Sequence, residues 1–262
     1  MSKDQGLGGK IVLVTGGSRG IGRAIALAFA AQGSHVVVTG RTQATLDAVA
    51  EEIHRLGGKA LPIACDVTDK QEVEALKGKI TNQQGAVQIL INNAGVAPAA
   101  GFLEMPDSLW EEVLRVNLTG TYNCCKVFLA EMIAAKWGRI INIASIVAKV
   151  AYSHTSAYTT SKHAVLGLTR SLAVETARAG VTVNAICPGY VETEMTLNNA
   201  KLLAEKRGKK VEEALGLFKG SSPQNRLIAP EEVADLAVML ASKSAAGITG
   251  QAINIDGGAV MV

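Results

Sequence analysis

The chain has 262 residues and a formal net charge of +3, with basic and acidic side chains interspersed along its length. This charge pattern excludes the strongly basic surface that is typical of a nucleic-acid-binding protein. The apolar runs fall short of the roughly 18 residues that a membrane-spanning helix requires, so we expect no membrane partner.

Apolar runs alternate with amphipathic segments from one end of the chain to the other. The expected strands cover residues 11–15, 35–39, 60–65, 87–92, 139–144, 181–187 and 251–255. The expected helices cover residues 20–31, 43–56, 107–135, 158–177 and 230–240. A further helix is predicted to follow Thr68 as its N-cap, with Gln71 completing a capping box.

Near-continuous apolar strands between amphipathic helices predict an α/β fold. We expect a doubly wound, Rossmann-type parallel sheet with helices on both faces. No Pro/Ser-rich linker, repeat or low-complexity tract divides the chain. Since α/β folds often reach about 250 residues as one domain, residues 1–262 are expected to form a single domain.

A glycine-rich segment follows the first expected strand and begins the first expected helix. It reads Thr15-Gly16-Gly17-Ser18-Arg19-Gly20-Ile21-Gly22. Glycines permit a tight turn and a close approach of the main chain to a pyrophosphate, and the helix N-terminus supplies free N–H groups. In this strand–loop–helix context the segment predicts a dinucleotide-binding site rather than a generic turn.

Tyr158 and Lys162 stand four positions apart on an expected helix, so both side chains share one face. An unperturbed phenol titrates around pH 10. A nearby ammonium stabilises the phenolate and moves the group toward useful acid/base strength. An acid/base pair combined with a dinucleotide site indicates hydride transfer.

Three motifs resemble the short-chain dehydrogenase/reductase family. They are T-G-x-x-x-G-x-G at residues 15–22, Asn92-Asn93-Ala94-Gly95, and Tyr158-x-x-x-Lys162. The resemblance extends from about residue 9 to residue 259, and residues 182–193 are similar to 3-oxoacyl-(acyl carrier protein) reductases and polyketide ketoreductases within the family. It implies an oxidoreductase that reduces a ketone to a secondary alcohol by hydride transfer.

The resemblance also implies the catalytic residues, which are Asn117, Ser145, Tyr158 and Lys162. Tyr158 would be the general acid/base, and Lys162 would tune it and bind the nicotinamide ribose. Ser145 would hold the substrate oxygen. Asn117, at a helix kink, would complete a proton relay through water to Lys162. Each residue alone has an ordinary structural explanation, but their joint occurrence in chain order favours catalysis.

Two arginines favour NADP(H) over NAD(H). NAD-preferring members tend to carry an acidic residue near the end of the second strand, where this chain has Gly40 followed by Arg41, while Arg19 lies in the glycine-rich loop. A guanidinium suits a 2′-phosphate, although both arginines could be ordinary surface charges. The full set of expected cofactor contacts is Gly16, Ser18, Arg19, Gly20, Ile21, Gly22, Arg41, Asp66, Val67, Asn93, Ala94, Gly95, Tyr158, Lys162, Pro188, Gly189, Val191 and Thr193.

Asp66 resembles the family residue that contacts the adenine amino group, with a turn role before the next helix as the alternative. Asn92 is expected to be mostly structural. The Ala94–Gly95 main chain should lie beside the cofactor ribose.

Residues from about 194 to 220 are expected to form a substrate lid. It carries the basic side chains Lys201, Lys206, Arg207, Lys209 and Lys210. These could attract a phosphate-bearing carrier such as coenzyme A or an acyl carrier protein, or they could form a solvated helix face. The candidate pocket residues are Pro98, Val147, Ala148, Tyr152, His154 and Tyr190.

Two other functions remain open on the sequence. One is a secondary-alcohol or hydroxyacyl-CoA dehydrogenase that works mainly in the oxidative direction, and the other is a non-catalytic NADP-binding regulatory protein.

The resemblance also implies a homotetramer. The N-terminus lacks the apolar core of a signal peptide. No metal site is expected, because none of the four cysteines has a partner at ligand spacing, and we expect all four to be reduced in a cytoplasmic protein.

Overall fold

A computed structural model describes residues 5–262, so part of the segment on which the signal-peptide interpretation rests lies outside the described residues. Within this range, seven parallel strands form one sheet in the order β3-β2-β1-β4-β5-β6-β7. The strands are β1 Ile11–Thr15, β2 His35–Gly40, β3 Lys59–Ala64, β4 Ile89–Asn92, β5 Gly138–Ile143, β6 Val181–Pro188 and β7 Ala252–Ile255. The expected doubly wound fold is confirmed.

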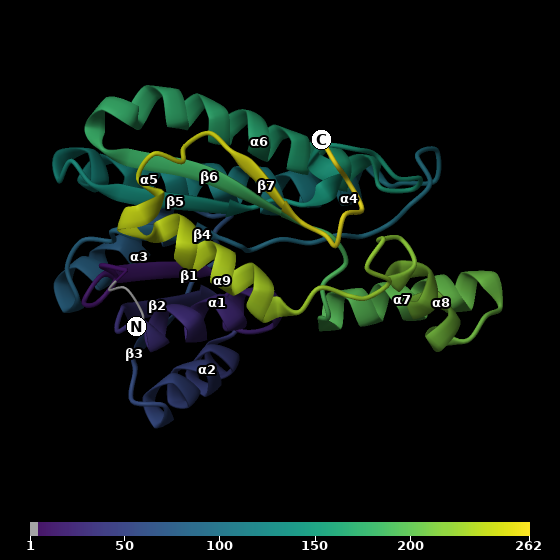
Figure 1. The fold of residues 1–262 in the computed structure, drawn as a ribbon, viewed down its shortest axis with the longest axis horizontal. Helices are drawn as coiled ribbons and strands as arrows, with labels where there is room; N and C mark the ends of the chain where they lie inside the picture. Colours follow the sequence, from purple (N-terminus) through teal and green to yellow (C-terminus); the bar gives the residue numbers. More distant parts are fainter. Residues whose placement is uncertain (1–4) are drawn as a thin grey trace.

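Helices cover both faces of this sheet (Figure 1). They are α1 Gly20–Ala31, α2 Gln43–Arg55, α3 Lys70–Gln83, α4 Asp107–Leu114, α5 Gly120–Ala134, α6 Ser156–Thr176, α7 Glu194–Arg207, α8 Val211–Lys219 and α9 Pro230–Ala241. Short 3-10 turns occur at Ile146–Ala148, Ala177–Ala179 and Lys243–Ala245. No helix within residues 5–262 is both long enough and apolar enough to cross a membrane.

Successive residues of a strand enter two different cores. Val12 and Val14 of β1 pack with α1, α2 and α9, whereas Ile11 and Leu13 pack with α3, α5 and α6. Side chains of a strand alternate between faces, so a strand covered on both sides must be apolar at every position. This requirement explains the unbroken apolar runs in the sequence.

The strand order creates a switch point beside β1. From β1 the chain moves outward through β2 to β3, and it then returns to place β4 on the other side of β1. Ligands of doubly wound folds bind at such a point, outside the carboxyl ends of the strands.

The predicted start of the third helix was wrong. Asp69, not Thr68, is the N-cap of α3, and its carboxylate accepts hydrogen bonds from the main-chain N–H groups of Gln71 and Glu72 at 2.8 and 3.3 Å. The Thr68 hydroxyl is instead hydrogen-bonded by Arg115. A carboxylate next to the first helical residue reaches the free N–H groups and complements the helix dipole.

The long helix expected over residues 107–135 is interrupted. A π-helical turn at Arg115–Thr119 separates α4 from α5, at the position where the family resemblance implied a kink. Such π-turns add a residue to the helical turn and re-aim its side chains, and they often occur at functional sites.

The expected lid is a helix pair, α7 and α8, that extends from one end of the molecule (Figure 1). The two helices pack together through Ala200, Ala204 and Ala214. Tyr190, just after β6, stacks on Phe218 of α8 with ring centroids 4.3 Å apart, which attaches this helix pair to the end of the sheet.

Candidate functional site

A cavity of about 120 Å³ lies at the carboxyl edge of the sheet. Its walls come from segments that are far apart in the sequence and meet beside the switch point. The lining residues are Ile21, Asn93, Gly95, Val96, Ile143, Ala144, Ser145, Tyr158, Lys162, Pro188, Gly189, Val191, Thr193, Met195 and Thr196.

The glycine-rich loop between β1 and α1 has a conformation that requires glycine. Gly16 and Gly20 have positive φ angles of 62° and 51°. A Cβ on Gly22 would stand 2.2 Å from the carbonyl oxygen of Gly16. Arg19, the N-cap of α1, makes no side-chain hydrogen bond to the helix, so it leaves the N–H groups of the first turn available to a ligand. The loop therefore fits the phosphates of a dinucleotide.

Hydrogen bonds join this loop to the segment after β4. The Thr15 hydroxyl accepts bonds from the main-chain N–H groups of Asn93 and Ala94, both at 3.0 Å. The Asn93 side chain donates to the carbonyl oxygens of Thr15 and Gly16, also at 3.0 Å. Asn92 points into the core and donates to Asn142 at 2.8 Å, which agrees with its expected structural role.

Tyr158 and Ser145 both line the cavity, and the Ser145 hydroxyl is near enough to the phenol to influence its pKa. Tyr158 is partly exposed along its surface, but its hydroxyl lies among protein atoms. Burial raises the pKa of Tyr158 to about 12, and the Ser145 hydroxyl opposes this rise. The phenol is therefore protonated at neutral pH in this state.

The Lys162 side chain lies near the Tyr158 ring and is only 5% exposed. Its Nζ donates to the carbonyl oxygen of Ile143 at 2.8 Å and lies 5.7 Å from the centroid of the Tyr158 ring. Burial lowers the pKa of Lys162 to about 8. The expected lowering of the Tyr158 pKa by Lys162 is not found, because the ammonium is bonded to the main chain and desolvation of the phenol dominates.

Asn117 lies behind the cavity wall, on the π-helical turn, and is buried. Its Oδ1 accepts from the N–H of Val96 at 2.8 Å, and its Nδ2 donates to the Val96 carbonyl at 2.9 Å. A Cβ placed on Gly95 would stand 3.1 Å from Asn117 Oδ1 and 3.7 Å from Lys162 Nζ. The structure therefore brings all four predicted catalytic residues to one place.

The end of β6 closes the cavity from the side of the lid. The N–H of Gly189 donates to the Ile255 carbonyl at 3.1 Å, and a Cβ on Gly189 would stand 3.0 Å from the Cβ of Asp256. Thr193 is the N-cap of α7, and its Cγ2 would stand 3.1 Å from a Cβ on Gly20. The N-cap of α7 thus contacts the glycine-rich loop.

The residues expected at the adenosine end lie outside this cavity. Arg19 is exposed, and its Nη1 forms an ion pair with Glu194 Oε2 at 3.0 Å. Arg41 is also exposed. Burial alone would raise the pKa of Asp66, but hydrogen bonds from Thr68 and the nearby arginine charges lower it. Because Asp66 Oδ1 accepts from the Thr68 N–H at 2.9 Å, the turn role is present.

Ser18 is half-buried in the loop, and Val67 is buried against Gly120. The candidate substrate residues do not line the cavity described above. Tyr152 and His154 are exposed, whereas Val147 and Ala148 are buried. Pro98 and Tyr190 are half-buried.

The sequence interpretation missed several cavity residues. Val96, Ile143, Ala144, Met195 and Thr196 line the cavity but carry no motif. A signal exists for Met195 and Thr196 alone, because they follow the Thr193 N-cap within one helical turn.

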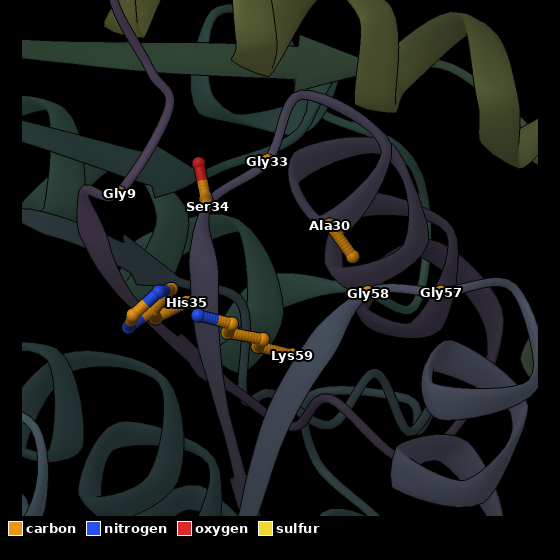
Figure 2. Close-up of a pocket in the computed structure, with 8 residues that line it drawn as sticks. All are labelled: Gly9, Ala30, Gly33, Ser34, His35, Gly57, Gly58 and Lys59. Atoms are coloured by element: carbon orange, nitrogen blue, oxygen red, sulfur yellow. The ribbon is translucent and has the colours of Figure 1, made fainter.

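A larger hollow of about 310 Å³ lies near the amino ends of β2 and β3 (Figure 2). Glycine main chain makes up much of its wall, and His35 and Lys59 are its ionisable residues. It contains none of the predicted site residues, and His35 Nδ1 is engaged with Gln84 Oε1 at 3.1 Å. The smaller cavity is therefore the candidate active site. Within residues 5–262, no group of three or more His, Cys, Asp or Glu side chains is arranged to hold a metal ion.

Comparisons with known proteins agree with this geometry. The profile described as short chain dehydrogenase matches residues 10–202. The chain is 41% identical over 253 residues to a 3-oxoacyl-(acyl-carrier-protein) reductase, FabG, of Aquifex aeolicus, covering 96% of this chain and 98% of that protein. It is 38% identical over 256 residues to a D-beta-hydroxybutyrate dehydrogenase of Cupriavidus necator, with coverage of 96% and 98%.

Among solved structures, a variant of the actinorhodin polyketide ketoreductase crystallised with NADPH superposes with a TM-score of 0.93. The two chains are 36% identical, and the match covers 99% of each. The chain therefore belongs to the short-chain dehydrogenase/reductase family of nicotinamide-dependent oxidoreductases.

Proposed function

We propose that this protein is an NADP(H)-dependent ketoreductase that reduces a 3-oxoacyl or related ketone to a secondary alcohol, with Tyr158 as the general acid. The main support is that Ser145, Tyr158 and Lys162 line one cavity, with the Lys162 Nζ 5.7 Å from the centroid of the Tyr158 ring. A phenol whose pKa is about 12 carries the proton that carbonyl reduction consumes.

In this mechanism the glycine-rich loop and Asn93 hold the dinucleotide, which supplies a hydride when bound. The Ser145 hydroxyl binds the carbonyl oxygen of the substrate and fixes its orientation. Tyr158 donates its phenolic proton to that oxygen as negative charge develops there. Lys162 holds positive charge near the Tyr158 ring and stabilises the phenolate that remains. Asn117 supports the return of a proton through water.

Charge at the adenosine end supports NADP(H) over NAD(H). Gly40 ends β2 without a carboxylate, and exposed Arg41 follows it. Arg19 can give up the exposed ion pair with Glu194 for a phosphate dianion, because such surface pairs contribute only about 0–1 kcal/mol. The ketoreductase neighbour with NADPH supports the same choice.

Relatives that act on carrier-linked substrates support a carrier-bound ketone. The basic lid side chains at 201, 206, 207, 209 and 210 would attract its phosphate. The hydroxybutyrate dehydrogenase relative favours a second candidate, oxidation of a small hydroxy acid with the same groups acting in reverse.

We further propose that residues 1–262 work as one domain with α7 and α8 as the lid. Exposed apolar side chains on α5 and α6, namely Tyr122, Ile133 and Val174, support a homotetramer built through these helices. Four buried free cysteines suit a reducing, cytoplasmic compartment.

The test is oxidation of NADPH, with NADH in parallel, against a β-ketoester, a 3-oxoacyl thioester, a cyclic ketone and an aryl ketone. The Tyr158→Phe variant is the matched control, because it removes the proton donor and keeps the ring. Turnover with NADPH that falls by about a thousandfold in the variant supports the proposal, since acid catalysis contributes roughly 10²–10⁴-fold. NADPH binding without turnover of any substrate would favour a regulatory role, and turnover that survives in Tyr158→Phe would reject Tyr158 as the acid.

A further inference from the structure

Ser161 lies between Tyr158 and Lys162 in the sequence and has no role in the mechanism above. It is fully buried on α6, on the side that faces the π-helical turn. Its hydroxyl donates to the carbonyl oxygen of Tyr158 at 2.7 Å and accepts from Asn117 Nδ2 at 3.0 Å. One hydroxyl therefore connects the turn of helix that carries Tyr158 with the side chain of Asn117.

The direction of these bonds determines how the Asn117 amide is oriented. A serine hydroxyl has one proton, and Ser161 gives it to Tyr158, so toward Asn117 it can only accept. The Asn117 NH₂ group must then face Ser161. Its second N–H goes to the Val96 carbonyl, and Oδ1 receives the Val96 N–H.

Oδ1 also lies beside the Gly95 main chain, because a Cβ on Gly95 would stand 3.1 Å from it. An amide turned by 180° would direct its NH₂ group at the Val96 N–H and its oxygen at the Val96 carbonyl. The first contact would place donor against donor and the second acceptor against acceptor, and buried polar groups without partners are costly.

We propose that Ser161 is a positioning residue that holds the Asn117 amide in its working orientation. Through Asn117 it fixes the Gly95–Val96 segment of the cavity wall. The inference rests on the proposed ketoreductase function, because it assigns Ser161 to that site.

The test compares Ser161→Ala with Ser161→Thr, which retains a hydroxyl, and with Ser156→Ala. Ser156 is a matched control on the same helix, since its buried Oγ has no hydrogen-bond partner among the described residues. We expect kcat for NADPH-dependent ketone reduction to fall about tenfold in Ser161→Ala, while KM for the ketone stays within about twofold. Ser161→Thr should recover most of kcat, and Ser156→Ala should match the wild type.

A second readout needs no activity. Hydrogen exchange of the main chain at residues 93–98, measured by mass spectrometry without cofactor, should be faster in Ser161→Ala because the Val96 N–H loses its fixed acceptor. Ser161→Thr and Ser156→Ala should exchange like the wild type. If Ser161→Ala folds poorly, Ser161→Cys, with a weaker acceptor of similar size, should give an intermediate exchange rate.

The proposed ketoreductase function and the positioning role of Ser161 can fail separately. A wild-type enzyme without NADPH-dependent turnover would reject the proposed function, and the exchange experiment would still decide whether Ser161 holds Asn117. Unchanged exchange at residues 93–98 in Ser161→Ala, or equal losses of kcat in the Ala and Thr variants, would overturn the positioning role.

Discussion

Replacing Lys162 with Met should stabilise the folded protein relative to the wild type, and this gain should be larger at neutral pH than at alkaline pH. Lys162 is almost fully buried, and burial lowers its pKa from 10.5 to about 8. Folding therefore removes an ammonium from water at a free-energy cost. This cost is complete below about pH 8, where both states are protonated, and it declines as the pH rises toward the unfolded-state pKa.

The difference between the Lys162 pKa of 10.5 in the unfolded state and about 8 in the folded state sets the size of this free-energy cost. At about 1.36 kcal/mol per pH unit, it corresponds to a penalty of about 3 kcal/mol at pH 7. At pH 9.5 the folded-state lysine is mostly neutral, and only the one-unit difference between the pH and the unfolded-state pKa of 10.5 contributes. The penalty therefore falls to about 1.4 kcal/mol. The variant also loses the bond from Nζ to the Ile143 carbonyl, and the difference in this bond between the ammonium and the amine is already contained in the pKa shift.

Urea unfolding followed by circular dichroism at pH 7 and pH 9.5, at one fixed protein concentration, measures the change. Between the two conditions the wild type should gain about 2 kcal/mol relative to Lys162→Met. Lys201→Met is the control, because it removes an exposed ammonium and its difference from the wild type should not change. A constant difference for Lys162→Met, or a change in the opposite direction, would refute the reasoning that burial alone sets the state of Lys162.

Three further predictions test the loop, the lid and the cofactor preference. Gly22→Ala should destabilise the fold in urea unfolding by more than about 2 kcal/mol, because its Cβ would stand 2.2 Å from the Gly16 carbonyl oxygen, and a smaller loss would contradict this close approach. The stacked rings of Tyr190 and Phe218 should show a coupling energy of about 0.5–1.5 kcal/mol in a double-mutant cycle with Leu at each position, and a coupling near zero would mean that other contacts hold α8. Arg19→Gln should weaken NADPH binding by about tenfold in a fluorescence titration and leave NADH binding unchanged, because the lost contact is a charge-assisted bond to phosphate. Equal losses for both cofactors would assign the 2′-phosphate to another residue.

Local patterns predicted most of the framework because they report local constraints. The strand at 11–15 is apolar at its first four positions, and the structure buries all five residues between two helical layers. The motif at residues 15–22 requires glycine because Gly16, Gly20 and Gly22 have positive φ angles or no room for a Cβ. Errors occurred where two neighbouring residues offered similar chemistry, as at Thr68 and Asp69, where only the geometry of the first helical turn selects the cap.

The family resemblance identified Asn117, Ser145, Tyr158 and Lys162, and the fold brings them together at one edge of the sheet. It did not indicate the pKa values of Tyr158 and Lys162 in the folded protein. The high pKa of Tyr158 and the low pKa of Lys162 both arise from desolvation, which depends on every segment that packs around the two groups.

The sequence by itself determined the doubly wound sheet, the glycine-rich turn after its first strand and the shared helix face of Tyr158 and Lys162, because periodicity, glycine placement and helical spacing are properties of short segments. The tertiary structure decided which partners these groups have: Asn117 with Val96 and Ser161, Lys162 with Ile143, and Arg19 with Glu194. These contacts join residues that are distant in the chain. Their geometry follows from how the helices pack on the sheet, which no single segment encodes.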